Sequence, residues 1–330
     1  MKMTKKERIL ATLNREKTDR IPASFWRHFY EYETDAENLA GIMVDYQKEM
    51  DWDFMKVNFR ESYHDEAWGT KYEFYKDGVT KPKQLYYPVK TLNDYNNITL
   101  LEPLKSAPLK EQLETLHLIN KSLGGELFFV MTVFTPLAVI VKLVGNVDVL
   151  RDHIKNHKDI IHKVLNNITA SFEKFIEEAL NTGISGLFYA TRHWASNDYF
   201  TPEEFNEFCR PYDMRLLNIV KDCPFNILHV CQGNNMLQKL SDYPVHAFHW
   251  DSSDPTNPSL KHGMDFVKGS VMGGINHRTT IVKGTSSDCI REAEQSYSAT
   301  GGKGWILGAG CTYPPSAPVE NLKVLRDWGK

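Results

Sequence analysis

Two residues that could bind a metal ion stand close together in an apolar run of the sequence. His229 and Cys231 are separated by one valine in the run 227–231. Residues two apart on a strand point to the same side, so the imidazole and the thiol would project together as two ligands. Cys311 follows a later apolar run and offers a third ligand. This set favours Zn²⁺, and three protein ligands with one open position are the pattern of a catalytic zinc site.

Three charged residues near predicted strand ends are candidates for catalysis. Asp251 follows the next apolar run and could be a fourth, displaceable metal ligand or could hydrogen-bond a loop. Arg27 and Arg192 could each hold a carboxylate or phosphate through two parallel hydrogen bonds, or form a surface ion pair. Four further polar residues are expected to bind the substrate: His28, Asn58, His193 and Asn276.

The cysteine count argues against a disulfide framework. The chain has 5 cysteines, and five of its first eight residues are charged, with no apolar stretch behind them. Such a start is not a secretory signal, so we expect a reducing, cytoplasmic location. There, a special cysteine is a metal ligand or a nucleophile. Cys209, Cys223 and Cys289 fall on predicted helices or at their ends, and we interpret them as structural.

Charge and hydropathy exclude two classes of partner. Lysine and arginine total 39 and aspartate and glutamate total 42, which gives a net charge of −3. A chain this close to neutral has no overall basic field, so we expect no nucleic-acid partner. No apolar run approaches the length of a membrane-spanning helix, so we expect no membrane partner.

The elements that must position these residues follow an alternating pattern. Short apolar runs alternate with amphipathic segments, which predicts parallel strands joined by helices. Eight such units predict a closed (β/α)₈ barrel, with its active site at the carboxyl ends of the strands. The predicted strands are 21–28, 53–59, 127–133, 184–190, 226–231, 245–250, 268–275 and 304–309, and the clearest helices are 35–50, 158–182, 202–221, 286–299 and 318–329.

Two features depart from the repeating unit. Thr4 and Glu7 form a capping-box pattern, which predicts a helix ahead of the first strand. An excursion of about 60–125 separates the second and third strands, and Asp77-Gly78 within it is typical of a hairpin turn. We therefore expect one domain over 1–330, a single (β/α)₈ TIM barrel with an N-terminal helix and an insertion at its mouth.

The chain resembles the uroporphyrinogen decarboxylase superfamily over essentially its whole length. The resemblance lies in Asp19-Arg20-Ile21-Pro22 after the first helix, and in Asp51-Trp52-Asp53-Phe54-Met55-Lys56 at the second strand. It continues through Ile306-Leu307-Gly308 and the segment from Pro314 to Leu322. The resemblance implies a single TIM barrel, in agreement with the alternating pattern.

Two departures from the decarboxylase pattern bear on the reaction. Uroporphyrinogen decarboxylases use no metal and bind an acidic tetrapyrrole through an Arg-Gln-Ala-Gly-Arg stretch. Here the corresponding segment, 26–31, holds one arginine, Arg27. Those enzymes also end their last strand in Leu-Gly-His-Gly, where this chain has Ala309 in place of the histidine. Both differences count against porphyrinogen decarboxylation.

The other branch of the superfamily fits the metal-binding residues. Its zinc-dependent methyltransferases, such as methylcobalamin:coenzyme M methyltransferases, carry His-x-Cys and a distant cysteine as zinc ligands. His229, Cys231 and Cys311 match these positions. In the cobalamin-independent methionine synthases, which share the barrel, an acidic ligand occupies the place of Asp251. The resemblance implies zinc, a methylcobalamin or other methylcorrinoid donor that a corrinoid protein could carry, and a small thiol acceptor.

Three functional hypotheses follow. The first is a zinc-dependent methyltransferase, in which zinc deprotonates a thiol whose free pKa is about 8.5. The second is a metal-independent decarboxylase of a uroporphyrinogen-like acid, which would contain no zinc. The third is a non-catalytic corrinoid- or tetrapyrrole-binding protein with a structural zinc, in which the protein would fill every coordination position.

Overall fold

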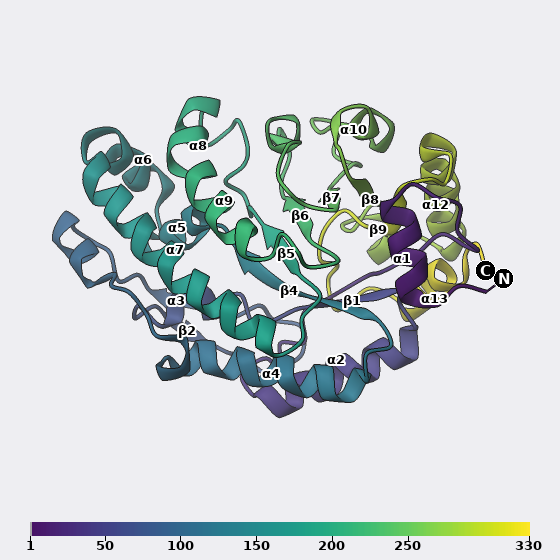
Figure 1. The fold of residues 1–330 in the computed structure, drawn as a ribbon, viewed down its shortest axis with the longest axis horizontal. Helices are drawn as coiled ribbons and strands as arrows, with labels where there is room; N and C mark the ends of the chain where they lie inside the picture. The colour runs from purple at the N-terminus through teal and green to yellow at the C-terminus, as the bar shows by residue number, and fades with distance from the viewer. Residues whose placement is uncertain (1) are drawn as a thin grey trace.

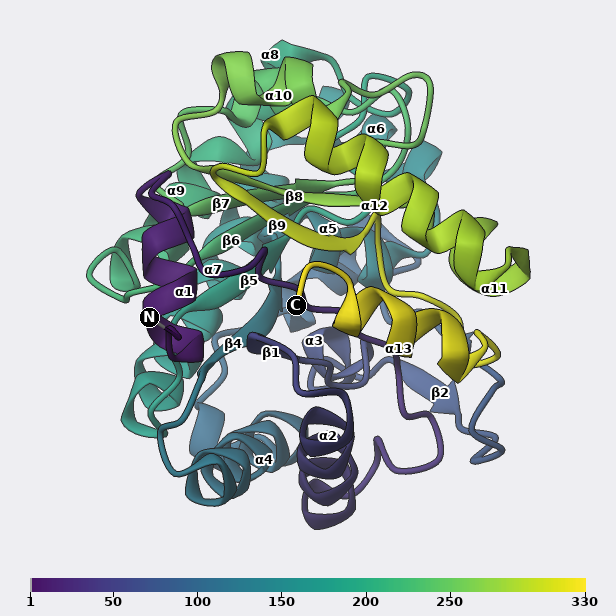
Figure 2. The same ribbon diagram turned by 90° about the vertical axis from the view of Figure 1, so that its right-hand side faces the viewer.

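The fold is a curled parallel sheet of seven strands. A computed structural model describes residues 2–330. The strands are hydrogen-bonded in the order β1-β4-β5-β6-β7-β8-β9 and curl around a central axis (Figures 1 and 2). Because both faces are covered, the strands read as continuous apolar runs and are buried almost throughout. Their bounds are β1 (Phe54–Val57), β4 (Phe128–Phe134), β5 (Leu187–Ala190), β6 (Ile227–Val230), β7 (Ala247–Trp250), β8 (Ser270–Ile275) and β9 (Trp305–Ala309).

Helices connect the strands and cover the outside of the sheet, as parallel pairing requires. Figure 2 shows α10 and α12 on one side of the strands and α2 and α4 on the other. The predicted helix 202–221 is two helices, because Pro211 begins a new helix after Cys209. The helices are α1 (Lys5–Leu13), α2 (Ala36–Met50), α3 (Tyr63–Glu66), α4 (Ala107–Leu123), α5 (Pro136–Val144), α6 (Val147–Asn156), α7 (Lys158–Asn181), α8 (Pro202–Phe208), α9 (Arg210–Ile219), α10 (Leu260–Phe266), α11 (Thr280–Lys283), α12 (Ser286–Thr300) and α13 (Val319–Asp327).

The expected count of eight strands is not confirmed. The segment 21–28 forms a single parallel bridge, between Ala23 and Leu307, and no regular strand. Its backbone bonds Leu307 on one side, through Pro22 and Ser24, and the Asp53 N–H donates to the Ala23 carbonyl on the other. Pro22 has no N–H to give, which limits the ladder here. Residues 22–24 therefore lie between β9 and β1 without forming a full strand.

The first helix and the excursion follow the sequence patterns in outline. The capping box of Thr4 and Glu7 is present at the start of α1. In the excursion, β2 (Lys71–Glu73) pairs antiparallel with β3 (Lys83–Tyr86). Asp77 and Gly78 lie in the longer loop between these strands, where the Asp77 carboxylate accepts hydrogen bonds from the backbone N–H groups of Val79 and Thr80. Helix α4 packs against α2 and serves as the crossover helix from β1 to β4. No helix within residues 2–330 combines the length and apolar character needed to cross a membrane.

A buried ion cluster fixes the N-terminal segment to the barrel. Asp53 is 1% exposed and accepts hydrogen bonds from Arg8 at 2.6 Å and from Arg20 at 2.7 and 2.9 Å. It also accepts one from the Ala23 N–H at 2.8 Å, and Asp19 pairs with Arg8 at 2.7 Å. The cluster therefore holds α1 and residues 19–23 against the start of β1. Since the chain runs on directly to residues 26–28, it also sets where those residues stand.

We predict that Asp53→Asn lowers the free energy of unfolding by about 3 kcal/mol, because two largely buried guanidinium groups lose their shared carboxylate. Urea unfolding of the variant and the parent protein measures the difference. Asp327→Asn removes a carboxylate from an exposed ion pair with Arg326 and should change the free energy by less than about 1 kcal/mol. Equal effects of the two substitutions would contradict this assignment.

Candidate metal centre and substrate cavity

The three predicted metal ligands come together at the carboxyl ends of β6 and β9. His229 is the next-to-last residue of β6, Cys231 directly follows that strand, and Cys311 stands two residues after β9. One ligand atom of each lies within 4.8 Å of the other two, and the His229 Nε2 to Cys311 Sγ distance is 3.5 Å. Tetrahedral zinc with ordinary Zn–N and Zn–S bonds places such atoms about 3.6 Å apart. The spacing therefore suits one zinc ion.

The pKa values of the two thiols are shifted in opposite directions. A hydrogen bond from Cys231 holds the pKa of Cys311 well below its usual range, although burial opposes it, and His229 acts in the same direction. The hydrogen bond to Cys311 and burial raise the pKa of Cys231. The pair therefore favours one thiolate even before a cation is present, and a cation would favour the second. This buried, electron-rich cluster attracts a metal ion.

Stacking holds the imidazole ring of His229 in place. The ring packs on Phe188 at 5.3 Å and on His249 at 4.6 Å between ring centroids. Its Nδ1 is buried and has no hydrogen-bond partner within residues 2–330. Nε2 faces Cys311 Sγ at 3.5 Å, so it is the ring nitrogen placed to serve as a ligand.

His249 and Asp251 support the loop that carries Cys311. The His249 Nε2–H donates to the Ala309 carbonyl at 2.7 Å, and burial keeps the pKa of His249 well below its usual range. The Asp251 carboxylate bonds Ser253 and lies 3.6 Å from His277. A Cβ on Gly310 would stand 2.5 Å from Asp251 Oδ1, so this loop has room only for glycine. Asp251 is not among the three clustered donors, and its role as a fourth ligand stays a prediction.

A cavity of about 370 Å³ opens onto the three donors. The predicted residues His28, Asn58, Arg192 and His193 line it. Aromatic rings, including those of Trp26, Phe188 and Tyr63, form much of its wall. The cavity thus presents the metal ligands to a small molecule from a largely apolar space.

Three predicted residues do not line this cavity: Asp251, described above, and Arg27 and Asn276. Trp26 and His28 face it, and since side chains alternate along extended backbone, Arg27 points the other way. There its guanidinium donates to the Pro315 carbonyl at 3.2 Å and covers the Phe29 ring. Asn276 instead accepts hydrogen bonds from the two backbone N–H groups of Arg278 and Thr279, so it caps a loop. Arg27 and Asn276 thus lie outside the cavity lining, and their roles in catalysis and substrate binding stay predictions.

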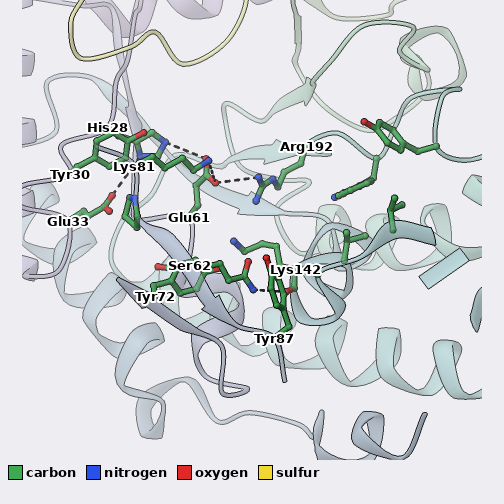
Figure 3. A pocket seen from close by; sticks show the side chains of 17 residues that line it. His28, Tyr30, Glu33, Glu61, Ser62, Tyr72, Lys81, Tyr87, Lys142 and Arg192 are labelled. Atoms are coloured by element: carbon green, nitrogen blue, oxygen red, sulfur yellow. Dashed lines mark hydrogen bonds and ion pairs between the residues drawn. The ribbon is translucent and has the colours of Figure 1, made fainter. Parts of the chain in front are cut away.

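A charged group missed in the sequence lies at the mouth of the cavity. The Glu61 carboxylate stands 2.9 Å from Lys81, 3.4 Å from Arg192 and 3.7 Å from His28 (Figure 3). Burial raises the pKa of Glu61, but Arg192 and Lys81 outweigh it and hold that pKa well below the usual range. Glu61 is therefore ionised and forms ion pairs with the neighbouring cations Lys81 and Arg192. Its position in an irregular loop after β1 gave no signal in the sequence.

Glu61 and the side chains around it lie between this inner cavity and an outer cavity of about 430 Å³. His28, Tyr30, Glu61, Lys81 and Arg192 line both. The excursion supplies Tyr72, which lies near Lys142 in this cavity (Figure 3). The Tyr72 hydroxyl donates to Asp65 at 2.8 Å, and Asp65 pairs with Lys142 at 3.3 Å.

Two buried groups near the mouth are neutral at pH 7. Burial lowers the pKa of His28 to about 4. Burial, with Glu61, raises the pKa of Glu33 to about 8. His28 is therefore uncharged, and Glu33 retains its proton. The protonation states of His28 and Glu33 could not be predicted from the sequence, because they depend on burial.

Comparison with known proteins identifies the family. The family model for uroporphyrinogen decarboxylase (URO-D) matches residues 4–330. The chain belongs to the uroporphyrinogen decarboxylase family. Related curated proteins include the uroporphyrinogen decarboxylase of Synechococcus sp., 24% identical over 263 residues that span 76% of this chain and 71% of the relative. That of Prochlorococcus marinus is 23% identical over 255 residues, 74% of this chain and 70% of the relative.

Solved structures show the same fold for this URO-D family member. A methyltransferase from Methanosarcina mazei aligns with a TM-score of 0.85 at 20% identity and covers 99% of both chains. A putative vitamin-B12-independent methionine synthase from Listeria monocytogenes aligns with a TM-score of 0.56 at 13% identity, covering 94% of this chain and 97% of that one. These likenesses establish the barrel-like α/β fold, and membership of the family indicates an enzyme.

We predict that Glu33 makes the protein less stable as pH rises from 5 to 8.5. Its folded-state pKa lies above its unfolded value, so the folded state holds the extra proton and loses that advantage as pH passes through about 8. Urea unfolding of the parent and Glu33→Gln at both pH values isolates this term. The stability of the variant relative to the parent should rise by about 2–4 kcal/mol over this range; an unchanged difference would show that Glu33 titrates normally.

Proposed function

We propose that this URO-D family member is a zinc-dependent methyltransferase that moves a methyl group from a methylcorrinoid to a thiol. The observation that carries the proposal is the meeting of His229, Cys231 and Cys311 at one edge of an open cavity. Bound there, zinc would supply the Lewis acidity that keeps a thiol deprotonated at neutral pH, ready to accept the methyl group. The fold shared with the Methanosarcina mazei methyltransferase supports this choice.

The chain's own residues would orient the reactants and exclude water. His229, Cys231 and Cys311 would hold the metal, and the contacts of His249 and Asp251 would fix the Cys311 loop. The aromatic wall around the donors would keep competing water from the reacting atoms. We place the protein in the cytoplasm, with a small thiol and a corrinoid protein as its partners, and with no nucleic-acid or membrane partner.

The cavity favours this reaction over porphyrinogen decarboxylation. Arg192 is the one arginine that lines either cavity within residues 2–330, and it is already paired with Glu61. A tetrapyrrole with several carboxylates would need more free cations than this site offers. A non-catalytic binding protein would have no use for an open side on the metal centre, so the cavity beside the three donors favours an enzyme over that alternative as well.

We predict about one zinc ion per chain in protein purified without added metal. Cys231→Ser and Cys311→Ser should each weaken zinc binding at least about 100-fold, since a thiolate ligand is lost. Metal analysis by mass spectrometry provides the measurement. The matched control is Cys289→Ser, a buried cysteine on α12 that should leave zinc content unchanged. A parent protein that takes up no zinc under reducing conditions would rule the proposal out.

The methyl-transfer step needs its own assay. We expect methylcobalamin to lose its methyl group to a thiol in the presence of the zinc-loaded protein, followed by the change in the corrinoid absorption spectrum. Cys311→Ser should lower the rate at least about 100-fold. Zinc-loaded protein that shows no turnover with any small thiol would favour the non-catalytic alternative.

Gly310→Ala tests whether the Cys311 loop is held by its close approach to Asp251. The added methyl group would overlap Asp251 Oδ1 and must displace the loop. We predict a loss of zinc affinity of about 10- to 100-fold, the size typical of changes beside a metal ligand. Gly41→Ala on α2 is the control, because nothing stands within 4 Å of its added Cβ. Equal affinities in both variants would remove this role from Gly310.

A further inference from the structure

A lysine inside the barrel has no part in the metal centre. Lys56 on β1 is 7% exposed and lines the inner cavity together with His229, Cys231 and Cys311. Its ammonium donates to Asn58 Oδ1 and lies 4.7 Å from the Phe188 ring. Within residues 2–330, no carboxylate oxygen lies within 4.0 Å of its Nζ. A buried amine without a counter-ion, in a cavity open to ligands, suggests that an anion belongs there.

A second observation points to the same place. Asn58 is 2% exposed, and its Nδ2 has no hydrogen-bond partner in the part of the chain that the structure describes. Lys56 and Asn58 are two residues apart on extended backbone, so their side chains project to the same side. Both line the inner cavity. The ammonium and the amide N–H are thus neighbouring donors with unused hydrogen-bonding capacity.

Other charges near the cavity do not satisfy Lys56. Burial lowers the pKa of Lys56 to about 7, even though the charges of Cys311 and Glu61 oppose that change. Glu61 is held by Lys81, Arg192 and His28. An incoming anion would therefore supply the ion pair that the protein itself does not provide.

We propose that Lys56 and Asn58 form a carboxylate-binding subsite in the inner cavity, beside the metal centre. An ammonium and a planar amide N–H standing together match the two oxygens of a carboxylate. The surrounding rings of Trp26 and Phe188 leave the pair in an apolar setting that strengthens the contact. If the proposed function holds, the methyl acceptor is then a small thiol that bears a carboxylate; that last link rests on the proposed function, and the subsite does not.

Calorimetric titration of the protein as purified tests the subsite without any reaction. The probes are 3-(methylthio)propionate and its uncharged amide, which differ only in the carboxylate. The acid should bind at least 10-fold more tightly than the amide, and Lys56→Met should abolish that preference. Lys6→Met is the matched control, because Lys6 also stands over an aromatic ring, Phe128 at 5.5 Å, but does not line the cavity. Equal binding of acid and amide by the parent protein would overturn the subsite.

Asn58→Asp provides a variant of nearly the same shape. Its new carboxylate would pair with Lys56 and should weaken binding of the acid at least 10-fold while leaving that of the amide unchanged. Lys56→Gln serves if the methionine variant does not fold. Retained preference for the acid in Asn58→Asp and Lys56→Gln would contradict the proposal. Lys56-dependent binding of 2-(methylthio)ethanesulfonate that is tighter than binding of the carboxylate probe would also contradict it, because it would assign the site to sulfonates.

The two proposals fail in different ways. Preference for the acid without methyl transfer to any thiol would leave the subsite standing and overturn the methyltransferase. Methyl transfer to 3-mercaptopropionate and 2-mercaptoethanol with equal KM values, and no preference in calorimetry, would overturn the subsite and leave the methyltransferase standing.

Discussion

The approach of two cysteine thiols to one imidazole places the strictest demand on this structure. A buried thiolate is costly unless a cation or hydrogen bonds compensate it. Here Cys311 receives hydrogen bonds from Cys231 and His229, and all three donors lie within 4.8 Å of one another. Their spacing suits zinc, which would neutralise the cluster. Strands β6 and β9 must therefore end at the same edge, with β7 and β8 between them and little tolerance in either loop.

Several contacts meet that demand. His249 on the intervening strand β7 bonds the Ala309 carbonyl at the end of β9, and Gly310 allows the next turn to pass against Asp251. At the other end of the barrel, Asp53 ties the N-terminal segment to β1. That segment leads on to Trp26 and His28 in the cavity wall. The charged groups at the mouth differ from the one inside the cavity. The cations at the mouth are paired with Glu61, whereas Lys56 inside has no counter-ion.

The sequence predicted that His229, Cys231 and Cys311 lie together because their signal is local. His-x-Cys on an apolar run defines both the strand and the side to which its ligands point, and a curled parallel sheet brings Cys311 to the same edge. Arg27 and Asn276 show the limit of that argument. Both stand near strand ends, but the side to which each points depends on one residue of register in irregular backbone. The first predicted strand, 21–28, does not form a regular strand for a similar reason, since its apolar character does not show that Pro22 interrupts the ladder.

Other features depend on tertiary contacts and left no pattern to find. The apolar helix α5 over Pro136–Val144 is an exception, because its signals are local: Thr135 caps its start and Gly145 follows its end. Glu61 and Lys81 come from the excursion, and only the folded chain places them together. The states of Glu33, His28 and Lys56 are set by burial. Sequence alone thus found the centre of the site, and the structure supplied its surroundings.

X-ray absorption at the zinc edge tests the central claim most directly. The account predicts one nitrogen and two sulfur ligands from the protein, with one further sulfur when a small thiol is added to the purified enzyme. A site with four protein ligands that does not change on adding thiol would contradict an open coordination position. Protein that binds no zinc at His229, Cys231 and Cys311 would contradict the account as a whole.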